Sequence, residues 1–296
     1  MTALPTLIDY AAPLPPARVL PDSKARWDLD PSRAAVLVHD LQEYFLRPFD
    51  RACPALTTTL DGTARILAAA RAAGVPVFYT AQDGDHSDRG LQGDLWGPGM
   101  RAVASDTAIV PEVAPAPGDR LVTKRRYSAF AKTDLAEQLA AAGRDQLVIT
   151  GVYAHIGITA TALDAFQREV HPFVPADAIA AFTHDQHVRA LDIVADSCGV
   201  VTLTDAVVGR LAPVAEESGW EAVVRDALTR ALPAAALTSA LADPEADLFA
   251  VGLSSLKAFE LLDDLADAGV DIDFGELVRR PTLAFLLEQG RMPAQR

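Results

Sequence analysis

Apolar and polar positions along this chain define two alternating kinds of segment. Short runs rich in Val, Ile and Leu predict buried strands at residues 34–39, 75–80, 120–124, 146–150, 173–176 and 200–204. Ala- and Leu-rich segments with helical spacing lie between most of these runs, at 57–73, 133–143, 158–169 and 185–196. This alternation favours a doubly wound α/β fold, in which helices cover both faces of a mostly parallel sheet.

The pattern changes near residue 208, where the polar, Pro-containing segment GRLAPVAEESG reads as a linker. Helices are predicted beyond it, at 220–231, 255–268 and 281–289, and the Ala-rich stretch 230–247 is expected to be a long loop between helices. We therefore divide the chain into an α/β domain (1–208), a linker (209–219) and a small all-α, four-helix domain (220–296).

Composition narrows the choice of partners and compartment. Half of the 296 residues are hydrophobic, and the formal charge is -14, which argues against nucleic acid and anionic membranes as partners. Residues 214–296 hold 15 acidic and 7 basic residues, a net charge of -8, so a basic protein partner remains open. The sequence shows no signal peptide and no run of eighteen uncharged apolar residues, and its two cysteines are too few for a disulfide framework. We expect a cytoplasmic protein.

Candidate chemistry gathers at the predicted strand ends, where doubly wound folds bind ligands. Asp40, Lys124 and Tyr153 each lie at or just past a strand end, and Gly157 lies at a turn that opens a helix. A carboxylate, a lysine and free backbone N–H groups suit acid/base chemistry on an anion, which Arg89 could help to neutralise. Three of these residues also have structural explanations. Asp40 could cap a loop, Lys124 could be a solvated charge, and Gly157 could only permit close packing.

Five motifs occur together in this chain and in a fixed order: HDLQEYF (39–45), YTAQ (79–82), LWGPGM (95–100), TKRRYSAF (123–130) and GVYAHIG (151–157). From about residue 6 to residue 208 the chain thereby resembles the isochorismatase-like hydrolase superfamily. In the cysteine-using members of that superfamily the nucleophile stands at the position that Gly157 occupies here. The resemblance also implies a cis peptide between Val152 and Tyr153.

The resemblance implies hydrolysis of a vinyl ether, which needs no covalent acyl intermediate. Protonation of the methylene carbon gives an oxocarbenium ion, to which water adds. Asp40 is then the general acid, Lys124 orients or stabilises the substrate, and Gly157 leaves room for the substrate. Burial and a substrate carboxylate would favour the protonated form of Asp40, whereas Lys124 would favour the ionised form, and the sequence does not decide between them.

The same resemblance implies a set of substrate contacts. Carboxylates or hydroxyls of the substrate are expected to meet polar side chains, and two aromatic residues are expected to shape the pocket. The polar residues are Gln42, Gln82 and Arg89, and the aromatic residues are Trp96 and Tyr153.

Several other polar residues near these motifs have simpler explanations than catalysis. Asp83, Asp85 and His86 could suggest a metal site, but a loop rich in Asp and Gly is more typical of a solvated turn, and protonation of a vinyl ether requires no metal. His39 and His155 are expected to be hydrogen-bonded packing residues. The remaining histidines are expected on exposed turns or helix starts: His171, His184 and His187.

The second domain contains VGLSSLKAFELL (251–262), which places Ser255 at the start of an amphipathic helix. Ser255 could simply cap that helix. The segment, however, resembles the phosphopantetheine attachment motif of carrier proteins, with Ser255 at the modified position and Ser254 where the family usually has Asp. The resemblance implies a covalent 4′-phosphopantetheine on Ser255, whose phosphodiester would lie at the positive end of the helix.

Over nearly its full length the chain resembles the bifunctional isochorismatase and aryl carrier proteins of catecholate siderophore pathways. That resemblance implies isochorismate as substrate, 2,3-dihydro-2,3-dihydroxybenzoate and pyruvate as products, and a homo-oligomer. It also implies three protein partners: a phosphopantetheinyl transferase, an aryl-activating ligase and a condensation domain of a nonribosomal peptide synthetase. Two alternatives stay open, a phenazine-type hydrolase of the 2-amino analogue and a non-catalytic scaffold in which only the carrier is active.

Overall fold

A computed structural model describes residues 4–5, 7–11, 20–85, 87–212 and 219–290. Contacts divide the chain into two compact units, Met1–Pro213 and Val214–Arg296. The first unit continues past residue 208, where the sequence pattern placed its end, because helix α8 (Thr204–Leu211) packs on it and buries Leu211 completely. Residues 213–218 of the predicted linker lie outside the described residues.

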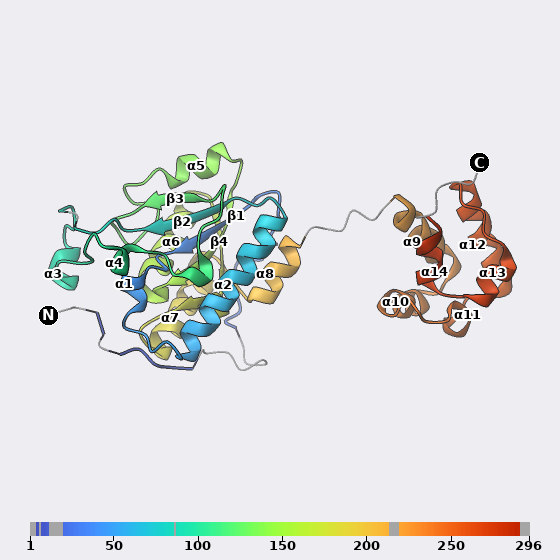
Figure 1. Ribbon diagram of the computed structural model, residues 1–296, viewed down its shortest axis with the longest axis horizontal. Coiled ribbons are helices and arrows are strands. Elements are labelled where there is room, and N and C mark those ends of the chain that lie inside the picture. The colour runs from blue at the N-terminus through green and yellow to red at the C-terminus, as the bar shows by residue number, and fades with distance from the viewer. Residues whose placement is uncertain (1–3, 6, 12–19, 86, 213–218, 291–296) are drawn as a thin grey trace. The chain divides into compact units, whose positions relative to one another are not determined.

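The first unit is built on a parallel sheet (Figure 1). Its described strands are β1 (Ala34–His39), β2 (Val77–Ala81), β3 (Arg120–Thr123), β4 (Gln146–Val152), β5 (His171–Pro175), β6 (Ile179–Ala180) and β7 (Val200–Thr202). Their order is β3-β2-β1-β4-β5-β7, β6 pairs with β4, and each of these pairings is parallel. The predicted mostly parallel sheet is confirmed, whereas β6, with two residues, was not predicted.

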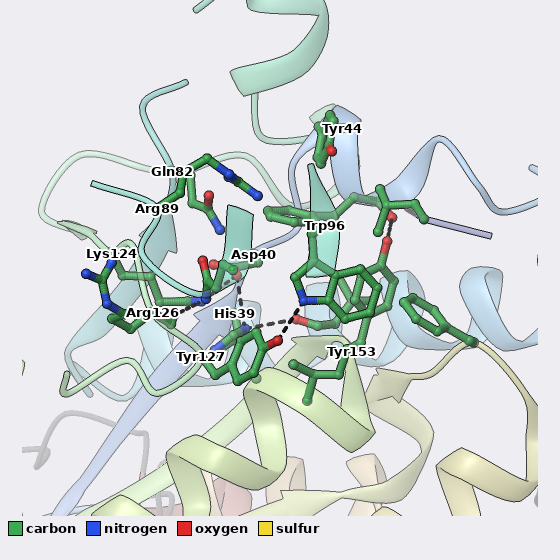
Figure 2. Close-up of a pocket in the computed structure, with 17 residues that line it drawn as sticks. His39, Asp40, Tyr44, Gln82, Arg89, Trp96, Lys124, Arg126, Tyr127 and Tyr153 are labelled. Carbon is green, nitrogen blue, oxygen red and sulfur yellow. Dashed lines mark hydrogen bonds and ion pairs between the residues drawn. The ribbon is translucent and has the colours of Figure 1, made fainter. Parts of the chain in front are cut away.

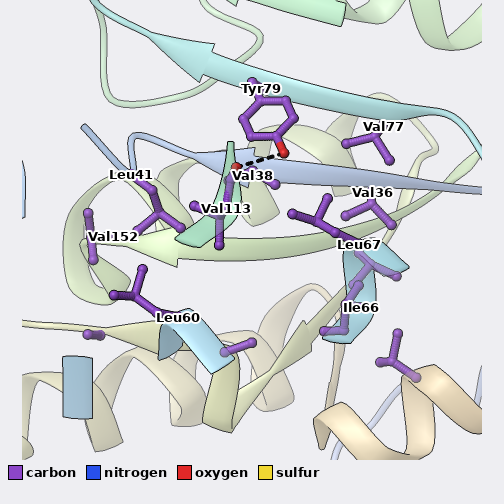
Figure 3. Packing of buried hydrophobic residues seen from close by; sticks show 14 of the residues in the cluster. Val36, Val38, Leu41, Leu60, Ile66, Leu67, Val77, Tyr79, Val113 and Val152 are labelled. Atoms are coloured by element: carbon purple, nitrogen blue, oxygen red, sulfur yellow. Dashed lines mark hydrogen bonds between the residues drawn. The ribbon is translucent and has the colours of Figure 1, made fainter. Parts of the chain in front are cut away.

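Alternation along β1 shows how the sheet is covered. Val36 and Val38 join a core cluster with helices α2 (Pro54–Ala72) and α8 (Figure 3). Ala35 and Leu37 join a second cluster with α5 (Leu135–Ala141), α6 (Thr159–Gln167) and α7 (His184–Ser197). Both faces are therefore buried, as a parallel sheet requires. The other described α-helices of this unit are α1 (Glu43–Leu46), α3 (Gln92–Trp96) and α4 (Ala104–Thr107).

The second unit is all-α, as predicted. Its described helices are α9 (Gly219–Ala231), α10 (Ala234–Ala242), α11 (Leu248–Val251), α12 (Ser255–Asp267), α13 (Phe274–Arg279) and α14 (Leu283–Gln289). The prediction of a long loop over 230–247 was wrong, because α10 lies there and buries Ala236 and Ala240 in the core of the unit. Within the described residues, neither unit contains a helix that is long and apolar enough to span a membrane.

Candidate active site and carrier site

The carboxyl ends of four neighbouring strands meet at one edge of the sheet. Asp40 follows β1, Gln82 follows β2, Lys124 follows β3 and Tyr153 follows β4. The strand order reverses between β1 and β4, and doubly wound sheets bind ligands at this kind of position. A pocket with about 580 Å³ of empty space lies there, and these four residues line it (Figure 2). Gly157 is also part of its wall.

Asp40 and Lys124 form a buried ion pair in this pocket. Lys124 Nζ lies 2.7 Å from Asp40 Oδ2, and both side chains are less than one-tenth exposed. Lys124 Nζ also donates a hydrogen bond of 2.9 Å to the Arg126 carbonyl, and Thr80 Oγ1 donates one of 2.6 Å to Asp40 Oδ1. Asp40 has a left-handed backbone conformation (φ 54°), which is uncommon outside glycine and is often found at functional sites.

His39 lies beside this pair and is completely buried. Its Nδ1 is 2.9 Å from the Val152 carbonyl, to which it donates, and 3.6 Å from Asp40 Oδ2. Burial is the main cause that lowers the pKa of His39 to about 4; Lys124 acts in the same direction and Asp40 opposes it. His39 is therefore neutral at pH 7, with its proton on Nδ1, and it is the hydrogen-bonded packing residue that the sequence suggested.

Gly157 lies in a π-helical turn, Ala154–Ile158, that leads from β4 into α6. A Cβ atom at this position would lie 2.2 Å from His39 Cε1. The sequence suggested that Gly157 leaves room for the substrate, but the imidazole of His39 fills the space that a side chain would need. The peptide between Val152 and Tyr153 is cis, as the resemblance implied.

The two glutamines differ in their surroundings. Gln42 is fully buried and does not line the pocket, because its side chain bonds to the main chain. Its Nε2 donates to the carbonyls of Gln82 and Thr107 at 2.9 and 2.7 Å, and its Oε1 accepts from the Gln82 N–H at 2.8 Å. Gln42 therefore ties the chain after β1 to the chain after β2, and the expected substrate contact is not available to it. Gln82 does line the pocket.

Arg89 and Trp96 line the pocket and are held by specific contacts. Arg89 Nε donates to the Gly97 carbonyl at 2.8 Å, and a Cβ at Gly99 would lie only 2.0 Å from the Arg89 guanidinium. The chain at 97–99 thus closes tightly around this cation. Trp96 Nε1 donates to Tyr127 Oη at 2.6 Å, which links the segment after β2 to the segment after β3 (Figure 2).

Much of the pocket wall was not predicted from the sequence. Tyr153 Oη donates to the Phe45 carbonyl, and its ring packs edge-on against Phe182, with 4.5 Å between ring centroids. Phe182 follows the two-residue strand β6, so only recognition of that strand could have revealed it. The additional lining residues are Leu4, Tyr44, Phe45, Gln92, Arg126, Tyr127, Ile156 and Phe182.

Asp83 and Asp85, which are metal ligands by residue type, lie in the loop after β2 and are bound by other groups. Asp83 pairs with Arg125 at 2.5 Å, and Asp85 accepts a hydrogen bond of 2.9 Å from the Ala102 N–H. His86 lies outside the described residues. The described part of the chain holds no group of three or more His, Cys, Asp or Glu residues with metal-binding geometry.

His187 lies in the first turn of α7, but it is not exposed as the sequence suggested, because its side chain is buried in the core and is 1% exposed. His187 Nε2 donates to the Ala176 carbonyl at 3.0 Å, and Tyr10 Oη donates to Nδ1 at 3.1 Å. Tyr10 Oη in turn accepts from the Ala181 N–H at 2.8 Å. Burial lowers the pKa of His187 to about 4, so the side chain is neutral at pH 7.

In the second unit, Ser255 is the first residue of α12 and is exposed. Ser254 is the N-cap residue, and its Oγ accepts a hydrogen bond of 3.3 Å from the Lys257 N–H. No hydrogen bond within the described residues involves the hydroxyl of Ser255. Ser254 thus caps the helix with its side chain, and the hydroxyl of the adjacent Ser255 stays accessible at the positive end of the helix.

Two family matches cover most of the chain: the isochorismatase domain matches residues 34–206, and the phosphopantetheine attachment site matches residues 222–288. Enterobactin synthase component B of Escherichia coli (strain K12) is 36% identical over 95% of this chain and 95% of its own length. Phenazine biosynthesis protein PhzD of Pseudomonas fluorescens is 47% identical over 70% of this chain and 100% of its own. A cysteine hydrolase from Pseudomonas syringae pv. phaseolicola 1448A has a solved structure that covers 63% of this chain and 95% of its own, with a TM-score of 0.58 and 29% identity. The chain therefore belongs to the isochorismatase family and carries a phosphopantetheine attachment domain after its hydrolase domain.

Proposed function

We propose that this chain hydrolyses isochorismate to 2,3-dihydro-2,3-dihydroxybenzoate and pyruvate, and that its carrier unit holds an aryl thioester for nonribosomal siderophore assembly. The observation that carries the hydrolase proposal is the buried pair of Asp40 and Lys124 in a pocket where Gly157 supplies no nucleophile. Such a pocket suits a bond that is cleaved by protonation and water addition better than an amide that is cleaved through a covalent intermediate.

Asp40 is the proposed general acid. Its proton goes to the methylene carbon of the enolpyruvyl group, the electrons of the C=C bond form the new C–H bond, and an oxocarbenium ion results. Water adds to this ion and returns a proton to Asp40, after which the hemiketal collapses to pyruvate and the ring alcohol. A substrate carboxylate close to the buried pair would favour the protonated acid before this step, while Lys124 stabilises the bound anion.

The pocket also offers groups for binding a rigid, doubly charged substrate. Arg89, held by the Gly97 carbonyl, is proposed to receive one carboxylate, and Gln82 is proposed to contact a carboxylate or hydroxyl. Trp96 and Tyr153, both fixed by hydrogen bonds, would pack against the ring. Their fixed positions would place the enolpyruvyl group against Asp40 without further ordering of the wall.

The carrier function rests on the exposed hydroxyl of Ser255 at the start of α12. A phosphopantetheinyl transferase would attach 4′-phosphopantetheine there, an aryl-activating ligase would load the aryl group, and a condensation domain would accept it. The net charge of -8 over residues 214–296 favours partners with basic docking surfaces. Cys53 and Cys198 are buried free thiols, which fits the proposed cytoplasmic location. The proposed homo-oligomer can be checked by light scattering.

Release of pyruvate from isochorismate, followed with the purified full chain, tests the hydrolase proposal. We expect turnover with the wild-type protein and almost none with Asp40→Asn, whose fold can be checked by circular dichroism. No pyruvate from isochorismate or from its 2-amino analogue would leave only the carrier function and would refute the hydrolase.

One observation favours a second candidate, hydrolysis of 2-amino-2-deoxyisochorismate. The PhzD relative is 47% identical over 210 residues, which are 70% of this chain, and the enterobactin synthase relative is 36% identical over 283 residues, which are 95% of it. The ratio of kcat/KM for the two substrates, measured on one preparation, decides between them. A ratio that favours the amino analogue would assign the protein to the phenazine-type reaction.

A further inference from the structure

The position of residue 157 is closed by a neighbouring side chain. A Cβ atom there would lie 2.2 Å from Cε1, 2.9 Å from Nε2 and 3.1 Å from Nδ1 of His39. Real Cβ atoms essentially never approach another heavy atom within 3.0 Å, so any side chain at 157 requires the ring to move. His39 has little freedom to move, because it is fully buried and its Nδ1 is bonded to the Val152 carbonyl.

Backbone conformation does not explain the glycine at 157. Gly151, on β4, has φ +110°, a conformation that L-residues rarely adopt, and its Cβ would also meet the His39 carbonyl at 2.2 Å. Gly157 has no such φ and lies in a helical turn that Ala could enter. Residue 157 is therefore a glycine for steric reasons, because the imidazole of His39 occupies the volume that a side chain would need.

His39 also stands next to the acid of the site. Its Nδ1 is 3.6 Å from Asp40 Oδ2, which is too far for a hydrogen bond. Nδ1 instead donates a hydrogen bond to the Val152 carbonyl on the neighbouring strand β4. The ring thus joins the end of β1, which carries Asp40, to the end of β4 and to the turn before α6. Its Nε2 is buried without a hydrogen bond of normal geometry, and the main chain of Tyr127 also acts on the ring. Packing, the bond to Val152 and this polar contact therefore place the ring.

We propose that His39 and Gly157 act as one coupled feature, in which His39 is a positioning residue that fills the side-chain volume of position 157 and holds Asp40 against β4. This pairing determines which chemistry the pocket supports. While the imidazole is in place, no nucleophilic side chain can be built at 157, and water remains the attacking group. Gly157→Cys alone meets the same overlap and is not expected to create a cysteine hydrolase.

A double-mutant cycle on the full chain tests the coupling without relying on activity. Gly157→Ala should lower the Tm of the hydrolase unit by roughly 3–10 °C through overpacking. His39→Asn keeps a donor at the position of Nδ1 but removes the ring atoms nearest to residue 157. In the His39→Asn background, Gly157→Ala should therefore lower the Tm by at most half as much as it does in the wild-type chain.

Gly62→Ala provides a matched control, because its Cβ would meet Thr204 Oγ1 at 2.7 Å, and Thr204 lies on α8 rather than in the pocket. His39→Asn should not rescue Gly62→Ala. Equal rescue of both glycine variants, or strictly additive losses of Tm for His39 and Gly157, would overturn the coupling. Because these readouts are thermal, they hold even if the substrate differs from the one proposed.

The positioning role is tested with kinetics and rests on the proposed function. Gly157→Ala should reduce kcat by roughly 10²-fold with a smaller effect on KM, because a shift of about 1 Å in the acid affects the chemical step most. His39→Asn should retain more of kcat than His39→Ala, which lacks the donor to Val152. Equal values of kcat for these two variants, or losses confined to KM, would show that His39 does not act through Asp40.

Discussion

Replacing Lys124 by Met would leave the Asp40 carboxylate buried without its cation. The two side chains are 3% and 7% exposed and their charged atoms are 2.7 Å apart, so solvent cannot replace the missing ammonium. Removal of one partner from a buried pair typically costs about 3–5 kcal/mol, far above the roughly 0–1 kcal/mol of a surface pair. The same change removes the cation proposed to stabilise the bound anion, so activity should fall as well.

The size of the stability loss can be checked by calorimetry. For a domain of this length, each kcal/mol shifts Tm by roughly 2–4 °C, so Lys124→Met should lower the transition of the hydrolase unit by roughly 6–20 °C. The transition of the carrier unit should stay unchanged, because Lys124 is not part of it, and it serves as an internal reference. Pyruvate release by Lys124→Met should be lost under conditions where this variant is still folded.

A second variant separates the loss of charge balance from the loss of packing. Asp40→Asn combined with Lys124→Met removes both charges, and exchange of a buried pair for neutral groups is often close to neutral for stability. The double variant should therefore be more stable than Lys124→Met alone, although it is inactive. If Lys124→Met melts within about 2 °C of wild type, or if the double variant is no more stable than the single one, the reasoning from burial is refuted.

Three further predictions follow from the site and the core. Asp40→Asn should reduce kcat by roughly 10²- to 10⁴-fold in the pyruvate assay, and turnover within a few fold of wild type would remove Asp40 from the acid role. Ser255→Ala should abolish addition of one phosphopantetheine, seen by intact mass, with hydrolase activity unchanged; Ser254→Ala should still be modified, and modification of Ser254 itself would contradict the assignment. His187 has a pKa of about 4 when folded and about 6.5 when unfolded, so between these values the unfolded chain binds more protons. Stability should therefore fall as the pH drops from 6.5 to 4, by up to roughly 3 kcal/mol in urea titrations. His187→Gln should reduce that fall, and an unchanged slope would argue against this role.

The sequence predicted the sheet well, because a strand buried on both faces appears as a continuous apolar run, as in AAVLVH at 34–39. It did not predict β6, since two residues cannot form a recognisable pattern. It misread α10 because AAALTSALA has almost no polar face, and helical periodicity is visible only where apolar and polar positions alternate. Ala has a high helix propensity, and the burial of Ala236 and Ala240 decides the structure there.

For the site, the sequence located the strand-end residues but not what surrounds each of them. Asp40 and Lys124 could be placed together because parallel strands end at one edge of the sheet. The engagement of Gln42 with main-chain groups, and the filling of the space at Gly157 by His39, depend on distances between segments more than 35 residues apart. Phe182 was missed for the same reason, since an aromatic residue after an unrecognised strand gives no local signal.

The N-cap position of α12 has a consequence for how carrier domains are recognised. Ser254 performs with a hydroxyl the hydrogen bonding that an aspartate would perform with a carboxylate, and both residue types rank among good N-caps. A search pattern that demands an acid before the modified serine would therefore pass over this chain, although its helix start is complete. The physical requirement is a short acceptor side chain, and Asn or Thr should satisfy it as well. A neutral acceptor would also avoid placing a second negative charge beside the phosphodiester that is proposed on Ser255.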